Sequence, residues 1–344
     1  MKTVKDVLET LERWTAEGKR IATATVIRTE RSTPRDPGTL LAVSDQGEIA
    51  GSVTGGCVEP SVYEEARQVL AGGPARLLTY GIADDEAFDV GLPCGGTVEI
   101  LVDLLRPDDL AAISAAIGEE RPVALAVPIA GARIGEEQLV GPGLGEGEIA
   151  DAARRLLALG RTGVIEVGGD EVFVSSFAPR PRLYVFGAID FAAALARVAR
   201  FLSWHVTVCD ARAKFVTPER FPEVDELVCA WPDEFLAGAP VDERTAICVL
   251  THDTKFDVPI LEAALRTPAG YIGAMGSRRT TESRNERLRA RGLTDEELAR
   301  IHAPIGLKIG ARSPEEVAVS IAAQLVEVFR AGSPRATASK EAVA

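Results

Sequence analysis

The sequence lacks the features of a membrane or exported protein. No apolar run among its 344 residues is long enough to cross a bilayer. The first residues, MKTVKDVLETLERW, place apolar side chains at helical spacing with acidic residues between them. A signal peptide would instead carry an uninterrupted apolar stretch. We therefore expect a cytoplasmic protein that does not bind membranes.

Positive charge is also scarce. The chain has 38 Lys and Arg residues against 51 Asp and Glu residues, a formal net charge of -13. This balance excludes a broad basic face for nucleic acid or for an anionic membrane. Any anion site must therefore be local, built from a few arginines and backbone amides.

Paired cysteines are missing as well. The five cysteines form no CxxC motif, which disfavours a closed zinc site. An odd number of cysteines without an export signal indicates free thiols in a reducing compartment. Three of them, Cys209, Cys229 and Cys248, lie in apolar strand patterns and are predicted to be core residues.

The length of the chain favours two domains. Residues 1–178 alternate helical and strand patterns and predict an α+β domain, with a hairpin turning at 45–47. The stretch APRPR, 178–182, is the predicted linker. Residues 182–330 alternate strands and helices, which predicts a Rossmann-like parallel sheet covered on both faces. The fold class is therefore α/β, with a disordered tail predicted over 331–344.

Two cysteines stand beside paired glycines. In GSVTGGCVEP, Gly55 and Gly56 precede Cys57, and in GLPCGG, Gly95 and Gly96 follow Cys94. Glycine reaches left-handed backbone conformations and lets another group approach the main chain closely. The pattern predicts that a ligand approaches these thiols. The alternative is that both are small buried residues in tight turns.

The second domain carries half of a dinucleotide-binding motif. In LYVFGAIDFA, Gly187 suits the tight turn after the first strand, but Ile189 replaces the central glycine and Asp190 follows it. Asp210 ends the second strand, where an acidic residue would hold a ribose hydroxyl. The sequence is thus compatible with an NAD(P) site or with a Rossmann-like scaffold that binds no nucleotide.

Further polar residues follow later strands of the same predicted sheet. Ligands collect at the carboxyl ends of parallel strands, and glycines, hydroxyls and arginines at a helix start can hold an anion. The alternative to a ligand site is that these residues have only structural roles. The histidine would then bond to a neighbouring carbonyl, and the arginines would pair with local acids such as Glu282. The candidate residues are Thr251, His252, Asp253, Gly276, Ser277 and Arg278.

Five motifs give the chain a resemblance to a known family. GSVTGGCVEP, GLPCGG, THDTKFD, YIGAMGSRR and PIGLKIGARSPEEVAVSIAAQL together, in this order and spacing, resemble the XdhC/CoxI family. The resemblance implies an N-terminal domain followed by a Rossmann-like one. One departure is that the family usually has Gly-His where this chain has Ile189 and Asp190, so no role is carried over to that position.

The resemblance also implies a function. Members are accessory proteins of molybdenum hydroxylases such as xanthine dehydrogenase and carbon monoxide dehydrogenase. They bind the molybdenum cofactor, protect it during sulfuration and deliver it to the apoenzyme. A hydroxylase apoenzyme is therefore an expected partner, with a cysteine desulfurase and a second copy of the chain as further ones.

Under this resemblance, Cys57 and Cys94 lie near one another and contact the metal. Sulfur is a suitable transient ligand or carrier for molybdenum, and the glycines let a bulky pterin approach. Glycine amides and Arg35 would hold the pterin's phosphate, with Glu59 as a polar partner. No catalytic residue is predicted. The alternatives are an NAD(P)-dependent oxidoreductase and a simple interaction module.

Overall fold

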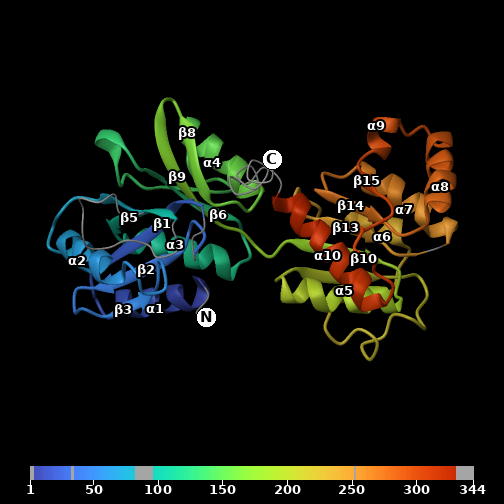
Figure 1. Ribbon diagram of the computed structural model, residues 1–344, viewed down its shortest axis with the longest axis horizontal. Helices are drawn as coiled ribbons and strands as arrows, with labels where there is room; N and C mark the ends of the chain where they lie inside the picture. The colour runs from blue at the N-terminus through green and yellow to red at the C-terminus, as the bar shows by residue number, and fades with distance from the viewer. Residues whose placement is uncertain (1–3, 32–34, 82–95, 252, 331–344) are drawn as a thin grey trace. The chain divides into compact units, whose positions relative to one another are not determined.

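The computed structural model describes residues 4–31, 35–81, 96–251 and 253–330, arranged in two compact units (Figure 1). The units comprise residues 1–179 and 180–344, and each is described here by itself. The first holds antiparallel sheets and the second a parallel sheet, so the predicted α/β fold class is confirmed. Cys94, Gly95, His252 and the tail 331–344 lie outside the described residues.

The first unit begins with a five-stranded antiparallel sheet in the order β3-β2-β1-β5-β4. Apolar and polar residues alternate along parts of the central strands β1 and β5, and the apolar side, which includes Ala22, Ala24 and Val98, is buried. Helix α2 packs Val62, Ala66 and Val69 on one face, whereas α1 brings Leu11 and Trp14 to a separate cluster. The elements are α1 (Val4–Ala16), β1 (Ile21–Glu30), β2 (Leu40–Ser44), β3 (Ile49–Gly51), α2 (Glu59–Leu70), β4 (Arg76–Tyr80) and β5 (Thr97–Leu104).

A second antiparallel sheet of four strands, in the order β7-β6-β9-β8, completes this unit. Helix α4 buries its alanine-rich face against it. A short 3-10 turn precedes β7, which pairs back with β6. The elements are α3 (Pro107–Gly118), β6 (Val123–Pro128), η1 (Gly131–Arg133), β7 (Gln138–Val140), α4 (Glu148–Ala158), β8 (Gly163–Val167) and β9 (Asp170–Phe177).

A buried acid stands between β5 and β7. The Glu137 side chain is largely buried, and its carboxylate lies 3.3 Å from the Nε atom of Arg106 without forming an aligned hydrogen bond. Burial, and then the neighbouring Asp109, raise the pKa of Glu137 above its usual 4.5. The folded unit therefore favours the protonated form of this carboxyl group more than water does.

We expect Glu137→Gln to stabilise the protein at pH 8 by about 1–3 kcal/mol, because it removes a buried group that must ionise. A raised folded-state pKa means that stability falls as pH rises above 4.5. The gain should therefore shrink in mildly acidic buffer. Thermal unfolding at the two pH values measures it, with Glu136→Gln, at an exposed neighbouring acid, as control. Identical pH slopes in wild type and Glu137→Gln would contradict the assignment.

The second unit contains a six-stranded sheet in the order β12-β11-β10-β13-β14-β15, with every pair parallel. Its strands are short apolar runs, as expected where a sheet is covered on both sides. The predicted Rossmann-like domain is confirmed. The strands are β10 (Arg182–Phe186), β11 (His205–Cys209), β12 (Glu226–Val228), β13 (Ala246–Val249), β14 (Tyr271–Ala274) and β15 (Ile301–His302).

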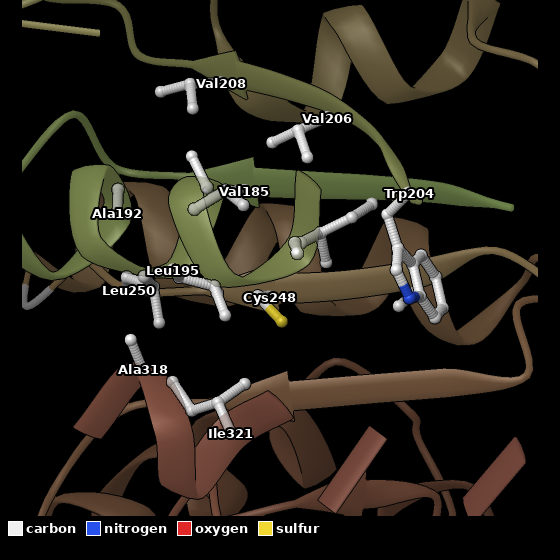
Figure 2. Packing of buried hydrophobic residues seen from close by; sticks show 14 of the residues in the cluster. Val185, Ala192, Leu195, Trp204, Val206, Val208, Cys248, Leu250, Ala318 and Ile321 are labelled. Atoms are coloured by element: carbon white, nitrogen blue, oxygen red, sulfur yellow. The ribbon is translucent and has the colours of Figure 1, made fainter. Parts of the chain in front are cut away.

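Helices cover both faces of this sheet. α5 and α10 lie side by side over one face, where Leu195, Cys248 and Ile321 belong to one apolar cluster (Figures 1 and 2). α7 and α8 cover the other face through residues such as Leu261 and Leu288. The helices are α5 (Asp190–Phe201), α6 (Pro232–Gly238), α7 (Thr254–Leu265), α8 (Arg278–Ala290), α9 (Asp295–Leu298) and α10 (Pro314–Arg330).

One cysteine prediction is wrong. Cys209 and Cys248 are buried, and burial raises the pKa of the Cys209 thiol to about 12 and raises that of Cys248 as well. Cys229, in contrast, is exposed. The apolar pattern continues through it, but strand β12 ends one residue earlier, at Val228, and Cys229 leaves the sheet.

No helix within the described ranges is both long and apolar enough to span a membrane.

Candidate functional site

The first glycine-cysteine motif forms the loop between β3 and α2. Val53 and Val58 point inward and are fully buried, which fixes the two ends of the loop. Between them, Gly55, Gly56 and Cys57 are exposed. The sequence thus holds the cysteine on an anchored loop at the surface, and the tight buried turn that was the alternative is not observed at Cys57.

A carboxylate inside the loop determines its shape. Glu59, the first residue of α2, folds back and accepts hydrogen bonds from the loop's own amides and hydroxyls. Gly55 and Gly56 have φ of 93° and 127°, a conformation that favours glycine and turns successive N–H groups toward one point. The donors are Ser52 Oγ at 2.7 Å, Val53 N at 3.2 Å, Thr54 N at 3.0 Å, Thr54 Oγ1 at 2.8 Å, Gly55 N at 2.9 Å and Gly56 N at 2.8 Å.

These hydrogen bonds stabilise the ionised carboxylate. Burial alone would raise the pKa of Glu59, but the Thr54 amide, the Ser52 hydroxyl and the other donors outweigh it and lower the pKa to about 2. The amides expected to bind a phosphate are therefore already engaged by Glu59. The other sides of Gly55 and Gly56 are open, since a Cβ atom built on either meets nothing within 4 Å. A ligand can approach Cys57 across these glycines.

The described ends of the second glycine-cysteine segment lie near the start of α2. Tyr80, the last residue of β4, shares a 3.0 Å hydrogen bond between its hydroxyl and that of Ser61 in the first turn of α2. Gly81 lies against Thr97, the first residue of β5. Gly96 is buried directly before β5. The described residues on either side of the segment therefore lie at the paired ends of β4 and β5, whereas Cys94 and Gly95 lie outside the described residues.

Arg35 is half-buried in the turn between β1 and β2, directly after the undescribed residues 32–34.

In the second unit, the turn after β10 packs tightly against the end of β13. Gly187 has φ of 113°, and a Cβ atom there would lie 2.9 Å from Cγ2 of Thr251. Only glycine fits this close approach. The two loops that flank the point where the strand order reverses are therefore in contact, at the place where an open sheet of this kind usually binds its ligand.

Asp210 is already occupied by protein groups. Its carboxylate accepts hydrogen bonds from the Ala188 amide at 2.8 Å and from Arg212, whose Nη2 atom lies 2.7 Å away. Burial would raise the pKa of Asp210, but the Arg212 side chain and the backbone amides of Ala188 and Arg212 lower it. A ribose hydroxyl would have to displace one of these partners.

A buried polar network joins the ends of β13 and β14. The Thr251 hydroxyl bonds to Asp257 of α7, and Asp257 lies 3.7 Å from Nη1 of Arg284 on α8. Arg284 also donates to the Met275 carbonyl at 3.0 Å. Both charged side chains are almost fully buried, at 3% and 2% exposed. The network therefore ties the carboxyl edge of the sheet to two helices.

The other predicted rim residues lie beside this network or at its surface. Asp253 is exposed and caps α7 by accepting from the Lys255 amide, with the Lys255 ammonium 3.1 Å away. Ser277 caps α8 by accepting from the Thr280 amide. Gly276 connects Met275 to this cap, and Arg278 is exposed in the first turn.

The structure thus brings Thr251, Gly276, Ser277 and Arg278 to one edge, where Gly187 meets Thr251. Asp257 and Arg284 were missed. Asp257 ends the quoted motif THDTKFD, and only its position one turn into α7 could have singled it out. Arg284 is one of several arginines in a polar helix, so the sequence carries no signal for its burial.

A hollow of about 480 Å³ lies elsewhere in this unit. It is lined by residues at the amino ends of β10, β11 and β12, among them Arg182, His205 and Glu226. None of the predicted site residues lines it. Among the described residues, no cluster of three or more His, Cys, Asp or Glu side chains could hold a metal ion.

Both units match known sequence families. Residues 14–81, which include the Cys57 loop, match the XdhC and CoxI family, and residues 183–325 match the XdhC Rossmann domain. The chain belongs to the XdhC/CoxI family. The two matches include both the Glu59-stabilised loop and the Thr251–Arg284 network.

Individual relatives of this XdhC/CoxI chain are distant but similar over most of their length. The chain is 28% identical to the molybdenum cofactor insertion chaperone PaoD of Escherichia coli K12, over 90% of this chain and 84% of that protein. It is 25% identical to a probable xanthine dehydrogenase subunit of Bacillus subtilis 168, over 88% and 92%. A solved structure of a xanthine dehydrogenase from Bacillus halodurans, 24% identical, covers 95% of this chain and 96% of its own with a TM-score of 0.66, which supports the fold.

Proposed function

We propose that this XdhC/CoxI protein acts in the cytoplasm as a maturation factor. It would bind the molybdenum cofactor as cargo, protect it during sulfuration and deliver it to the apoenzyme of a molybdenum hydroxylase such as xanthine dehydrogenase or carbon monoxide dehydrogenase. The names of two relatives, a molybdenum cofactor insertion chaperone and a probable xanthine dehydrogenase subunit, support this role.

The exposed position of Cys57 is the observation on which the proposal depends. The thiol stands at the surface of a loop that Glu59 holds in one conformation, beside two glycines whose outer faces are open. Molybdenum prefers soft sulfur ligands, and an anchored loop loses little conformational freedom when it binds. Cys57 is therefore the proposed contact to the metal.

Cys94 is the proposed second sulfur. In the sequence it stands two residues before Gly96, which is buried directly before β5. The hydrogen bond between Tyr80 and Ser61 joins the described end of β4 to the first turn of α2. This supports, within one unit, the expectation that the two thiols face the same cargo. A cysteine desulfurase that supplies sulfur, and assembly as a homodimer, belong to the same proposal.

The test is direct binding of the cofactor. Full-length protein is incubated anaerobically with cofactor released from a molybdoenzyme, and gel filtration is followed by pterin fluorescence and molybdenum content. We expect pterin and molybdenum to elute together with the protein. Elution of both at the position of free cofactor would contradict the proposal.

The alternative is an NAD(P)-dependent oxidoreductase. Asp210, directly after β11, is the feature that favours it. Its carboxylate, however, already accepts hydrogen bonds from the Ala188 amide and the Arg212 side chain. Ile189 also replaces the glycine that would let a pyrophosphate approach. Quenching of protein fluorescence by NADH separates the two functions, since tight saturable binding would favour the oxidoreductase.

A further inference from the structure

The first turn of α8 gathers positive charge at the positive end of a helix. Arg278 and Arg279 are its first two residues, both exposed, and the turn contains no acidic residue. Neither side chain has a hydrogen bond or ion pair with another described residue. Cations at a helix N-terminus are unfavourable because the helix dipole repels them. A bound anion would reverse this effect.

Two backbone amides in the first turn of α8 have no hydrogen-bond acceptor in the described part of the chain. The Ser277 side chain accepts from the Thr280 amide, and the Ser277 carbonyl accepts from the Thr281 amide. The amides of Arg278 and Arg279 are left without an acceptor, as is usual for the first turn of a helix. They point out of the helix start, where an oxyanion can bind them.

A second and independent observation concerns the buried side chain of Arg284, further along the same helix. Arg284 is 2% exposed, and its Nε and Nη2 atoms are buried without a hydrogen-bond partner. Its side chain runs back toward the helix start, where Nη1 reaches the Met275 carbonyl. Buried donors of this kind are rare in folded proteins and call for an acceptor.

Gly276 packs closely between the first turn of α8 and this guanidinium group. Its φ is 148°, and a Cβ atom there would lie 3.2 Å from Thr280 and 3.9 Å from Nη1 of Arg284. A side chain at this position would therefore fill the space beside Arg284. The glycine therefore lets the backbone before α8 lie close to the first turn and to the Arg284 guanidinium group.

We propose that the start of α8 is a binding site for a phosphate group, either a phosphate monoester or a diphosphate. The side chains and backbone amides of Arg278 and Arg279 would bind the phosphate oxygens on the solvent side. The buried guanidinium group of Arg284 would supply positive charge and hydrogen-bond donors on the protein side. Phosphate fits better than a carboxylate, because it offers more oxygens and more charge to several arginines. This assignment does not depend on the proposed function.

The probes are inorganic phosphate and pyrophosphate, titrated calorimetrically into the full chain without cofactor. We expect saturable binding that the double variant Arg278→Ala with Arg279→Ala weakens at least about tenfold, because several charge-assisted hydrogen bonds are lost. The matched control is Arg287→Ala with Arg289→Ala at the other end of α8, which changes the net charge equally. Stronger binding of pyrophosphate indicates a diphosphate ligand, and the reverse indicates a monoester.

Two results would overturn the site: no binding by the folded wild type, or equal weakening by both double variants. Arg284→Lys tests the buried donors, since it keeps the charge but loses the planar fork, and we expect weaker phosphate binding. If that variant does not fold, the two exposed double variants still decide. Retained cofactor binding without any phosphate binding would contradict this phosphate site but would not contradict the proposed function.

Discussion

Cys57→Ser should abolish cofactor retention and leave the fold unchanged. The thiol is exposed, so we expect the free energy of unfolding to stay within about 0.5 kcal/mol of wild type. A serine hydroxyl is a hard ligand and a poor replacement for sulfur on molybdenum. Because changes even in groups that only support a metal ligand cost about 10–100-fold in affinity, we expect at least that loss here. Pterin co-elution and thermal unfolding measure the two quantities.

The matched control for this prediction is Cys229→Ser. Cys229 is also an exposed free cysteine, but it follows β12 in the other unit. It should retain the cofactor as wild type does. Equal loss in both variants would mean that any surface thiol contributes, and retention by Cys57→Ser would remove Cys57 from the site.

Glu59→Gln should weaken both the loop and cofactor binding. The amide group keeps the shape of the carboxylate, but it turns an acceptor into a donor that faces N–H groups of the loop. Since hydrogen bonds to a charged group are lost, we expect destabilisation by about 2–3 kcal/mol. Binding should fall with it, because Cys57 loses its fixed position. Urea unfolding measures the stability, with Glu64→Gln, an exposed acid on the same helix, as control.

The same variant has a signature in its pH dependence. The pKa of Glu59 is lowered from 4.5 to about 2, so its contribution is complete above 4.5 and is lost as pH falls through the folded value. Wild type should therefore lose stability between these values by more than Glu59→Gln does. Equal acid slopes in the two proteins would show that the carboxylate is not the group that holds the loop.

The sequence predicts the architecture of the second unit well. Short apolar runs alternate with amphipathic helices, and that rhythm leaves few arrangements besides a parallel sheet covered on both faces. Short elements were not predicted. α9 has four residues, and its only local signal is the capping box formed by Thr294 and Glu297. β15 has two residues and becomes a strand only by pairing with β14.

The candidate site was predicted only in part, because its decisive contacts join residues through the fold. The glycines beside Cys57 indicate an unusual loop, but not that Glu59 would occupy its amides. That contact needs the positive φ of Gly55 and Gly56 together with the start of α2. Arg284 was overlooked for a related reason, since its burial follows from the packing of α8 against α7 and the sheet.

The central claim is that the Cys57 sulfur binds molybdenum, and X-ray absorption at the molybdenum edge tests it most directly. Spectra of the purified complex should contain more sulfur neighbours than those of free cofactor, and Cys229→Ser should keep them. In Cys57→Ser, any residual complex should have one sulfur neighbour fewer than wild type. An identical number of sulfur neighbours in wild type, Cys57→Ser and free cofactor would contradict the account.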